Sequence, residues 1–392
     1  MRKLFKSLPF RLALAMAVGI SGGLVANATI MQVVITVQNL LSALIMFTIP
    51  LIIIGFIAPS ITQLGSNASR MLGIALLLAY VSSVGASLFS VGSGYAILPH
   101  LHIVSETGAH QTLPEMLFDL KIPPVMSVMS ALVFSVFIGL AASWKRAEKM
   151  TAALNEFQGM VILLVTRVII PILPFFIACT FCSLAYEGTI TSQLPIFLVV
   201  ILIVIAGHFI WMAFLYSLAA LYARKNPLRV LRHYLPVYLT AIGTMSSAAT
   251  LPVAFACARK SDALRRDMID FGIPLFANIH LCGSVLTETF FVMTVSLALY
   301  GSLPSLSSLV LFSVLLGIFA IGAPGVPGGT VMASLGLIVS VLGFDTAGTA
   351  LMLTIFALQD SFGTACNVTS DGALTLILSE YSNRKLPVQT QK

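Results

Sequence analysis

The sequence is poor in charge. Charged residues make up 9% of the 392 residues, whereas an ordinary soluble domain contains about 25%. Hydrophobic residues account for 58%, and apolar runs of about 18 or more residues recur, each long enough to cross the ~30 Å hydrocarbon layer of a membrane. The scarcity of charge excludes a water-soluble fold of this size, and we predict an all-α polytopic membrane protein.

Other absences narrow the class. The first apolar run has no small-residue cleavage site and further spans follow it, so no cleavable signal peptide is expected. The five cysteines form no disulfide or metal framework: Cys179 and Cys182 have C-x-x-C spacing inside an apolar segment without a second ligand pair, which favours packing. The net charge of +7 indicates contact with anionic lipid rather than nucleic acid.

Eight membrane spans are predicted from the apolar segments. They lie near residues 8–26, 33–58, 70–92, 123–143, 157–184, 193–223, 267–299 and 347–379. Two further apolar segments, 228–258 and 305–342, are interrupted by GTMSSAATLP and IGAPGVPGGT. Because unwound backbone at membrane depth is tolerated only within protein or beside a water-filled cavity, we interpret both as re-entrant hairpins whose tips meet inside the protein.

Basic residues predict the orientation. With the N-terminus inside, the clusters within 145–149, 224–232, 259–266 and 384–385 all fall on the cytoplasmic side, as the positive-inside rule requires. We therefore expect an integral protein of the plasma (cytoplasmic) membrane with both termini in the cytoplasm.

Polar residues interrupt the last apolar segment, in QDSFGTACNVTSDG. Asp360, Thr364, Asn367 and Asp371 are spaced by four, three and four residues, so a helix presents them on one face. A charged side chain at membrane depth costs a few kcal/mol and usually marks a substrate or ion pathway. The alternative is that these polar residues only hold neighbouring helices together. Burying two carboxylates without a cationic partner would carry a large desolvation cost in such a structural role. The segment is therefore a predicted transport site.

Four motifs in the second half resemble one family. In order they are GTMSSAATLPVAFACARK, HLCGSVLTE, IGAPGVPGG and LQDSFGTACNVTSDG. They are similar to the motifs of the dicarboxylate/amino acid:cation symporters, the family with the glutamate transporter fold, and the last helix is most similar to the serine/threonine:sodium symporters. The resemblance extends over almost the whole chain.

The resemblance implies a homotrimer of eight transmembrane helices plus two re-entrant hairpins, working as an elevator-type transporter. A transport domain would slide across the membrane against a static scaffold. The implied divisions are 1–66 scaffold (spans one and two), 67–92 transport domain (span three), 93–122 external loop, 123–190 scaffold (spans four and five), 191–380 transport domain (span six, hairpin one, span seven, hairpin two, span eight) and 381–392 cytoplasmic tail.

The resemblance also implies a substrate site for an amino-acid zwitterion. Asp360 stands where the family binds the α-ammonium and Asn367 where it binds the α-carboxylate. A zwitterion that leaves water needs a carboxylate for its ammonium and amide or backbone donors for its carboxylate. The other implied substrate-binding residues are Ser246, Ser247, Ser284, Val326, Pro327, Gly328, Gly363 and Thr364.

A co-transported cation is implied as well, with no bound cofactor. Asp371 and Asn367 stand at a cation site to which Ser82 and Ser83 would add hydroxyls, and Na⁺ is the usual driver in the family. The chain departs from the family at His280 and Cys282, where the pattern has Asn and Asp, so one sodium site loses its carboxylate.

Proton coupling is an open alternative. Glu288 stands at the position that proton-coupled members use, and a histidine such as His280 changes its charge near neutral pH. Both are proton-coupling candidates, so H⁺ could replace one Na⁺. A hydrogen-bonded core role for His280 stays open beside this reading.

The expected substrate is a small neutral amino acid such as serine, threonine or alanine. Members that carry acidic substrates place an arginine at the positions of Gly363 or Met245, and a second substrate carboxylate buried without a partner is costly. The alternative is a Na⁺- or H⁺-coupled symporter of dicarboxylates or of acidic or sulfur-containing amino acids. An ion channel is a rival class. An enzyme pairing Ser246 or Ser247 with His280 is not expected, since no third orienting group can be argued.

Overall fold

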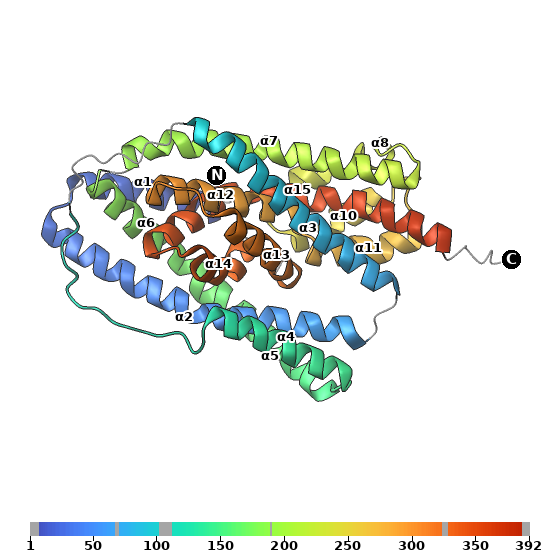
Figure 1. Ribbon diagram of the computed structural model, residues 1–392, viewed down its shortest axis with the longest axis horizontal. Helices are drawn as coiled ribbons and strands as arrows, with labels where there is room; N and C mark the ends of the chain where they lie inside the picture. Colours follow the sequence, from blue (N-terminus) through green and yellow to red (C-terminus); the bar gives the residue numbers. More distant parts are fainter. Residues whose placement is uncertain (1–7, 67–69, 102–111, 189, 324–327, 386–392) are drawn as a thin grey trace.

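The computed structural model describes residues 8–66, 70–101, 112–188, 190–323 and 328–385. All regular structure in these ranges is helical (Figure 1). The helices are apolar over most of their length, and a helix satisfies its own backbone hydrogen bonds, as a segment in hydrocarbon must. The described residues therefore have the secondary structure of a helical membrane protein.

Five of the helices form one packed group. They are α1 (Leu8–Val25), α2 (Ala28–Ser66), α4 (Val128–Trp144), α5 (Glu148–Leu164) and α6 (Ile170–Tyr186). A single π-helical turn, Val165–Ile169, joins α5 to α6. α1 packs along α6, and α2 packs against α4, α5 and α6. In Figure 1, α2, α4 and α5 lie along the lower edge of the molecule.

The remaining helices form a second group around α12 and α15. They are α3 (Arg70–Ile97), α7 (Ile190–Ala223), α8 (Leu228–Leu231), α9 (Leu235–Thr244), α10 (Ser247–Ala258), α11 (Arg266–Ile279), α12 (Cys282–Tyr300), α13 (Leu306–Gly322), α14 (Gly329–Leu342) and α15 (Thr346–Lys385). α12 packs against α15 and α3, and α15 also packs against α7, α9 and α11. α7 lies along the upper edge in Figure 1.

Helices occur at all the predicted spans, but α15, at the span predicted for 347–379, is not among the described helices that are apolar enough to count as candidate spans. Among the described residues, five helical segments are long and apolar enough to cross a membrane: Ala28–Pro59, Met71–Leu101, Glu148–Tyr186, Phe197–Ala223 and Arg266–Tyr300. Shorter apolar helices include Leu306–Gly322 and Gly329–Leu342. The count of eight spans and two re-entrant hairpins stays a prediction.

Both interrupted apolar segments are broken at the predicted places. α9 ends at Thr244, and its C-cap residue Met245 has a left-handed backbone with φ 53°. Ser246 caps α10 by accepting a hydrogen bond from Ala249 N. α13 ends at Gly322, and α14 follows Gly328, which has φ 69°. In each pair the two helices pack against each other. Their re-entrant position in a membrane stays a prediction.

The predicted span at 267–299 contains a break. The segment 267–299 is divided at His280 and Leu281, between α11 and α12. The backbone is extended at His280, with φ −116° and ψ 103°. The apolar pattern continues across the break and hides it. The span predicted at 70–92 also continues to Ile97, followed by a 3₁₀ turn to Leu101.

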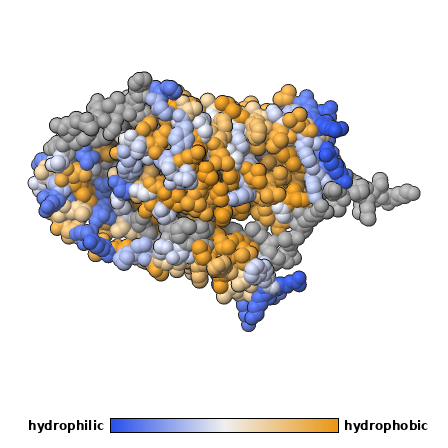
Figure 2. Space-filling view, viewed as in Figure 1, coloured by the Kyte–Doolittle hydropathy of each residue, from blue (hydrophilic) through white to orange (hydrophobic). Residues whose placement is uncertain are grey.

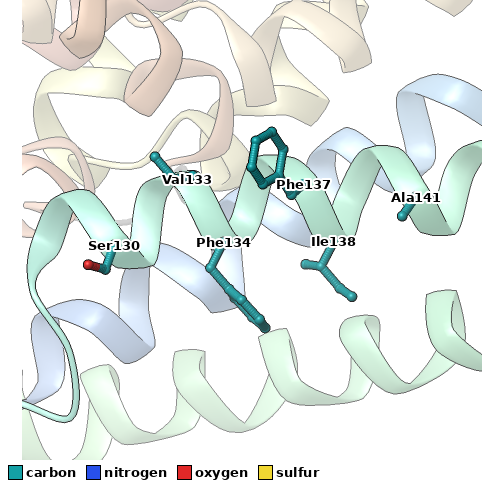
Figure 3. A pocket seen from close by; sticks show the side chains of 6 residues that line it. All are labelled: Ser130, Val133, Phe134, Phe137, Ile138 and Ala141. Carbon is teal, nitrogen blue, oxygen red and sulfur yellow. The ribbon is translucent and has the colours of Figure 1, made fainter.

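On the face shown in Figure 2, the described residues are mostly apolar in the middle of the molecule and polar toward its two ends. A shallow groove of about 690 Å³ lies on α4 and is lined by Ser130, Val133, Phe134, Phe137, Ile138 and Ala141 (Figure 3). All six residues belong to one helix, and Phe137 is 69% exposed. With a single hydroxyl in its lining, the groove does not resemble a site for a charged solute.

Candidate functional site

The polar face of α15 is buried. Asp360, Thr364, Asn367 and Asp371 are each at most 4% exposed, and α15 packs between α12, α7, α9 and α11. The helical spacing predicted one shared face, and the structure directs these side chains at other helices of the second group. Asn367, Asp360 and Asp371 have hydrogen-bond partners in three places, at the break before α12, at the start of α14 and at His280.

Asn367 caps the broken helix. Its Oδ1 accepts hydrogen bonds from Gly283 N at 2.7 Å and Ser284 N at 3.2 Å, and its Nδ2 donates to Ser284 Oγ at 2.9 Å. The first N–H groups of a helix have no partner within the helix, and here the amide of α15 supplies one. The break thus places helix N-terminal donors, which favour an anion, beside the residue assigned to the substrate carboxylate.

Asp360 contacts the start of α14. Its Oδ2 accepts a hydrogen bond from Gly328 N at 2.6 Å. Gly328 belongs to the second interrupted segment, so a predicted ammonium ligand and a predicted hairpin tip meet directly. Val326 and Pro327, the other two residues predicted at this tip, lie outside the described residues.

His280 joins Asp371 to α3. Its Nδ1 hydrogen-bonds Asp371 Oδ1 at 2.8 Å, and its Nε2 hydrogen-bonds Ser82 Oγ at 2.9 Å. All three residues are at most 4% exposed. The carboxylate and the hydroxyl expected to bind a cation are therefore both hydrogen-bonded to the imidazole ring. Ser83 Oγ, the other predicted hydroxyl ligand, is buried without a hydrogen-bond partner among the described residues.

Glu288 lies on α12 and faces α14. Its Oε1 accepts a hydrogen bond from Ser334 Oγ, and Oε2 has no partner in the part of the chain that the structure describes. The residue is fully buried, where an isolated carboxylate is costly. Gln359 is also fully buried, and neither of its amide atoms has a described partner. Gln359 is not among the residues predicted for the site, although its position beside Asp360 was a signal.

The tip between α9 and α10 is held by its own hydroxyls. Thr244 Oγ1 and Thr250 Oγ1 are 3.0 Å apart, and Thr250 Oγ1 donates to the carbonyl of Ser246 at 2.9 Å. Ser246 and Ser247 are 9% and 3% exposed. The predicted tip residues are thus ordered by the turn itself, with Ser246 as the cap of α10.

Ser82, His280 and Asp371 have the connectivity of a hydrolase triad, because the imidazole links a hydroxyl to a carboxylate. Their burial opposes that chemistry, since an acyl substrate must reach the hydroxyl. Ser82 lies in the middle of α3, where backbone N–H groups are committed to the helix rather than to an oxyanion. His280 bonds neither Ser246 nor Ser247 through its two described hydrogen bonds, so the enzyme reading gains no support.

Close packing holds the start of α12 against α15. A Cβ added at Gly283 would lie 2.5 Å from Cys366 Cβ and 2.5 Å from the Gly363 carbonyl oxygen. Only glycine lets the start of α12 approach α15 closely enough for Asn367 to reach it. The glycine in HLCGS was the available sequence signal, but glycine alone does not specify a break.

Apolar helices surrounding a buried polar seam, with helices broken beside it, are features of secondary transporters. A sequence profile of the sodium:dicarboxylate symporter family matches residues 8–381. The chain belongs to this family, which confirms the resemblance seen in the motifs.

Individual relatives agree with the family. The chain is 27% identical over 267 residues to excitatory amino acid transporter 3 of Oryctolagus cuniculus, covering 67% of this chain and 50% of the relative. It is 26% identical over 254 residues to excitatory amino acid transporter 2 of Mus musculus, covering 63% and 43%. An excitatory amino acid transporter of Caenorhabditis elegans is 26% identical over 271 residues, covering 67% and 52%. The matches span about half the length of these relatives.

Proposed function

We propose that this protein is a secondary active symporter that carries an acidic amino acid, driven by a cation gradient. The family match over residues 8–381 carries the proposal, and the matched relatives are named for excitatory amino acids. The names of these relatives therefore support an acidic substrate better than the small neutral amino acid expected from the sequence.

An amino acid is favoured over a dicarboxylate that lacks an ammonium. Asp360 offers a buried carboxylate with one backbone donor, Gly328 N, bonded to it. A substrate ammonium could replace or join that donor with a charge-assisted hydrogen bond. A substrate with only negative groups would meet a like charge there, which is unfavourable. The α-carboxylate would lie toward the amide of Asn367, at the N-terminal end of α12.

The driving cation is proposed to be Na⁺, as the family description indicates. Proton coupling through Glu288 remains the alternative, because this carboxylate has one hydroxyl partner and no described ion-pair partner. Driving uptake with a Na⁺ gradient and a pH gradient imposed separately distinguishes the two. No bound cofactor is part of the proposal.

Small neutral amino acids are the second candidate, and one observation favours them. Neither Gly363 nor Met245 can pair with a second substrate carboxylate, and a Cβ at position 363 would have ordinary contacts of 3.4 Å with Ser284. An acidic substrate would need that carboxylate neutralised by a co-transported cation or by backbone donors. Leaving it unpaired would cost about 3–5 kcal/mol.

Competition in proteoliposomes tests both candidates. We expect aspartate or glutamate to inhibit uptake of labelled aspartate more strongly than serine, threonine or alanine, with succinate-type dicarboxylates weaker. Arginine at position 363 supplies the missing bidentate partner, so Gly363→Arg should increase the preference for aspartate. A wild-type protein that prefers serine over every acidic amino acid contradicts the acidic assignment and supports the neutral candidate.

The mechanical part of the proposal follows the two packed groups of helices. α1, α2, α4, α5 and α6 would be the scaffold, and α3 with α7 to α15 would move as the transport domain. A homotrimer in the plasma membrane, in contact with lipid and with both termini cytoplasmic, completes the proposal. Accumulation of substrate against its gradient would distinguish this symporter from a channel.

A further inference from the structure

The partner of Asp371 is a side chain of the same helical group. His280 Nδ1 is 2.8 Å from Asp371 Oδ1, and His280 Nε2 is 2.9 Å from Ser82 Oγ. Exposed fractions are 0% for His280, 2% for Asp371 and 4% for Ser82. Both ring nitrogens are used, and α3, α15 and the α11–α12 break are joined through one ring.

The ring is fixed in this position by the backbone. His280 is the C-cap residue of α11, and its own N–H donates to the Phe276 carbonyl at 2.9 Å. The rings of Phe276 and His280 meet edge to face, with centroids 6.3 Å apart. A side chain held at a helix end by packing and two hydrogen bonds has little freedom to move aside.

The local donor set does not suit an alkali cation. Hard cations take several oxygen ligands, whereas imidazole nitrogen and thiolate sulfur suit softer metals. Here an imidazole occupies the space between the Asp371 carboxylate and the Ser82 hydroxyl, and Cys282, a potential sulfur ligand, follows two residues after His280. A Na⁺ ion at Asp371 would have to displace the ring and replace both of its hydrogen bonds.

We propose that the His280 side chain takes the place of a coupling cation at Asp371, so that this chain binds no Na⁺ at that carboxylate. The inference rests on the proposed cation-coupled symport and makes it more specific. The tethered imidazole satisfies the buried carboxylate throughout the cycle, which a diffusible ion does only while bound. Any Na⁺ that drives transport binds at other residues. The number of Na⁺ ions carried with each substrate is therefore one lower than in a symporter that binds Na⁺ at this carboxylate.

The test measures Na⁺ binding by the purified full-length protein as a rise in melting temperature with NaCl, against choline chloride at equal ionic strength. A ligand that binds the folded state raises its stability in proportion to the logarithm of its concentration above Kd. We expect Asp371→Asn to shift the half-maximal Na⁺ concentration by less than about twofold, or ~0.4 kcal/mol. We expect His280→Asn, which exchanges the ring for a shorter amide, to gain an additional Na⁺ response.

A double variant shows where the gained ion binds. His280→Asn with Asp371→Asn should lose the gained response, a change of at least about tenfold, or ~1.4 kcal/mol. His208→Asn is the matched control. His208 is also fully buried and bonds Gly283 O and Thr287 Oγ1 at the same end of α12. It does not contact Asp371 through these bonds, so its replacement should add no Na⁺ response.

Two results would overturn the inference: a tenfold or larger loss of Na⁺ affinity in Asp371→Asn alone, or a folded His280→Asn that gains no Na⁺ response. If His280→Asn does not fold, the Asp371→Asn comparison decides by itself. Because melting is measured without uptake, failure of the substrate panel would contradict the proposed function and leave this test intact.

Discussion

Two helix pairs show two ways of packing in this molecule. α1 meets α6 through glycines: a Cβ at Gly19 would collide with the Ala178 carbonyl oxygen, and one at Gly23 with the Cys182 carbonyl oxygen. α12 also meets α15 through a glycine, Gly283, and adds polar contacts, because Asn367 accepts hydrogen bonds from Gly283 N and Ser284 N. Small residues bring helix backbones together in membranes by van der Waals contact, without any need for polar groups.

The difference teaches where function is located. The glycine contacts between α1 and α6 bury no charged side chain, so they carry no desolvation cost of that kind and offer a solute no charged partner. The α12–α15 contact keeps carboxylates, an amide and helix N-terminal donors out of water, at a cost that a purely structural interface can avoid. Substitutions in the two interfaces should therefore fail in different ways.

The largest effect is expected at Asp360. Asp360→Asn keeps the shape of the side chain and removes the charge that would pair with a substrate ammonium. Loss of about 3 kcal/mol of pairing corresponds to a reduction in uptake of more than about 100-fold, measured as initial uptake per unit of folded protein in proteoliposomes. Asp262→Asn is the control, because Asp262 pairs with Arg229 at the exposed surface. Normal uptake by Asp360→Asn would remove Asp360 from the site.

Gly283→Ala should have the next largest effect. The added methyl would lie 2.5 Å from both Cys366 Cβ and the Gly363 carbonyl oxygen, so α12 must move away from α15 and the Asn367 contacts must lengthen. Overpacking of about 1–3 kcal/mol is expected to lower substrate affinity about tenfold or more, measured by substrate protection against thermal unfolding. Gly159→Ala, where a Cβ meets no atom within 4 Å, is the matched control. Equal affinities in the two variants would contradict the close-contact argument.

The corresponding change in the apolar pair is Gly23→Ala. Its Cβ would contact the Cys182 carbonyl oxygen and lie 2.8 Å from Ala185 Cβ, so the melting temperature should fall. We expect an overpacking cost of about 1–3 kcal/mol with less than about a twofold change in substrate affinity, since no polar contact is altered. A large loss of affinity without loss of stability would show that α1 and α6 take part in binding, against the comparison.

The smallest effect is expected at Glu288. Glu288→Gln keeps the acceptor for Ser334 and removes a group that can carry a proton. If Glu288 couples protons to transport, the uptake of the variant should depend less on pH than that of the wild type, measured across a pH series with Na⁺ held constant. Ser334→Ala removes the described hydrogen bond to Glu288 and leaves the carboxyl group in place, so the uptake of this variant should still depend on pH. Identical pH profiles for wild type and Glu288→Gln would reduce Glu288 to a structural role.

Much of the architecture could be predicted because it depends on local physics. A run of apolar residues forms a helix wherever backbone groups cannot reach water, so the helices at 8–66 and 190–223 follow from composition. The interruptions near Met245 and Gly328 followed from small residues and proline, which weaken a helix regardless of its neighbours. The shared face of Asp360, Asn367 and Asp371 followed from the helical repeat alone.

The break at His280 and Leu281 could not be predicted in the same way. The apolar pattern continues across it, and the structure that stabilises the new helix end is Asn367, which lies 84 residues away from Gly283 in the chain. A helix end that is capped by a distant residue leaves no signal in the local sequence, so it cannot be distinguished there from a continuous helix. That partner comes from the packing of α15 on α12.

The sequence by itself determined the class: too little charge for a soluble fold, helices of membrane length, and a polar face on the last helix. Only the tertiary structure decided what that face contacts. His280 lies 91 residues from Asp371 and 198 from Ser82, and the three meet because α3, α15 and the break before α12 converge. The rotation and spacing of packed helices decide which donor reaches a buried carboxylate. Local sequence propensities do not determine that packing geometry.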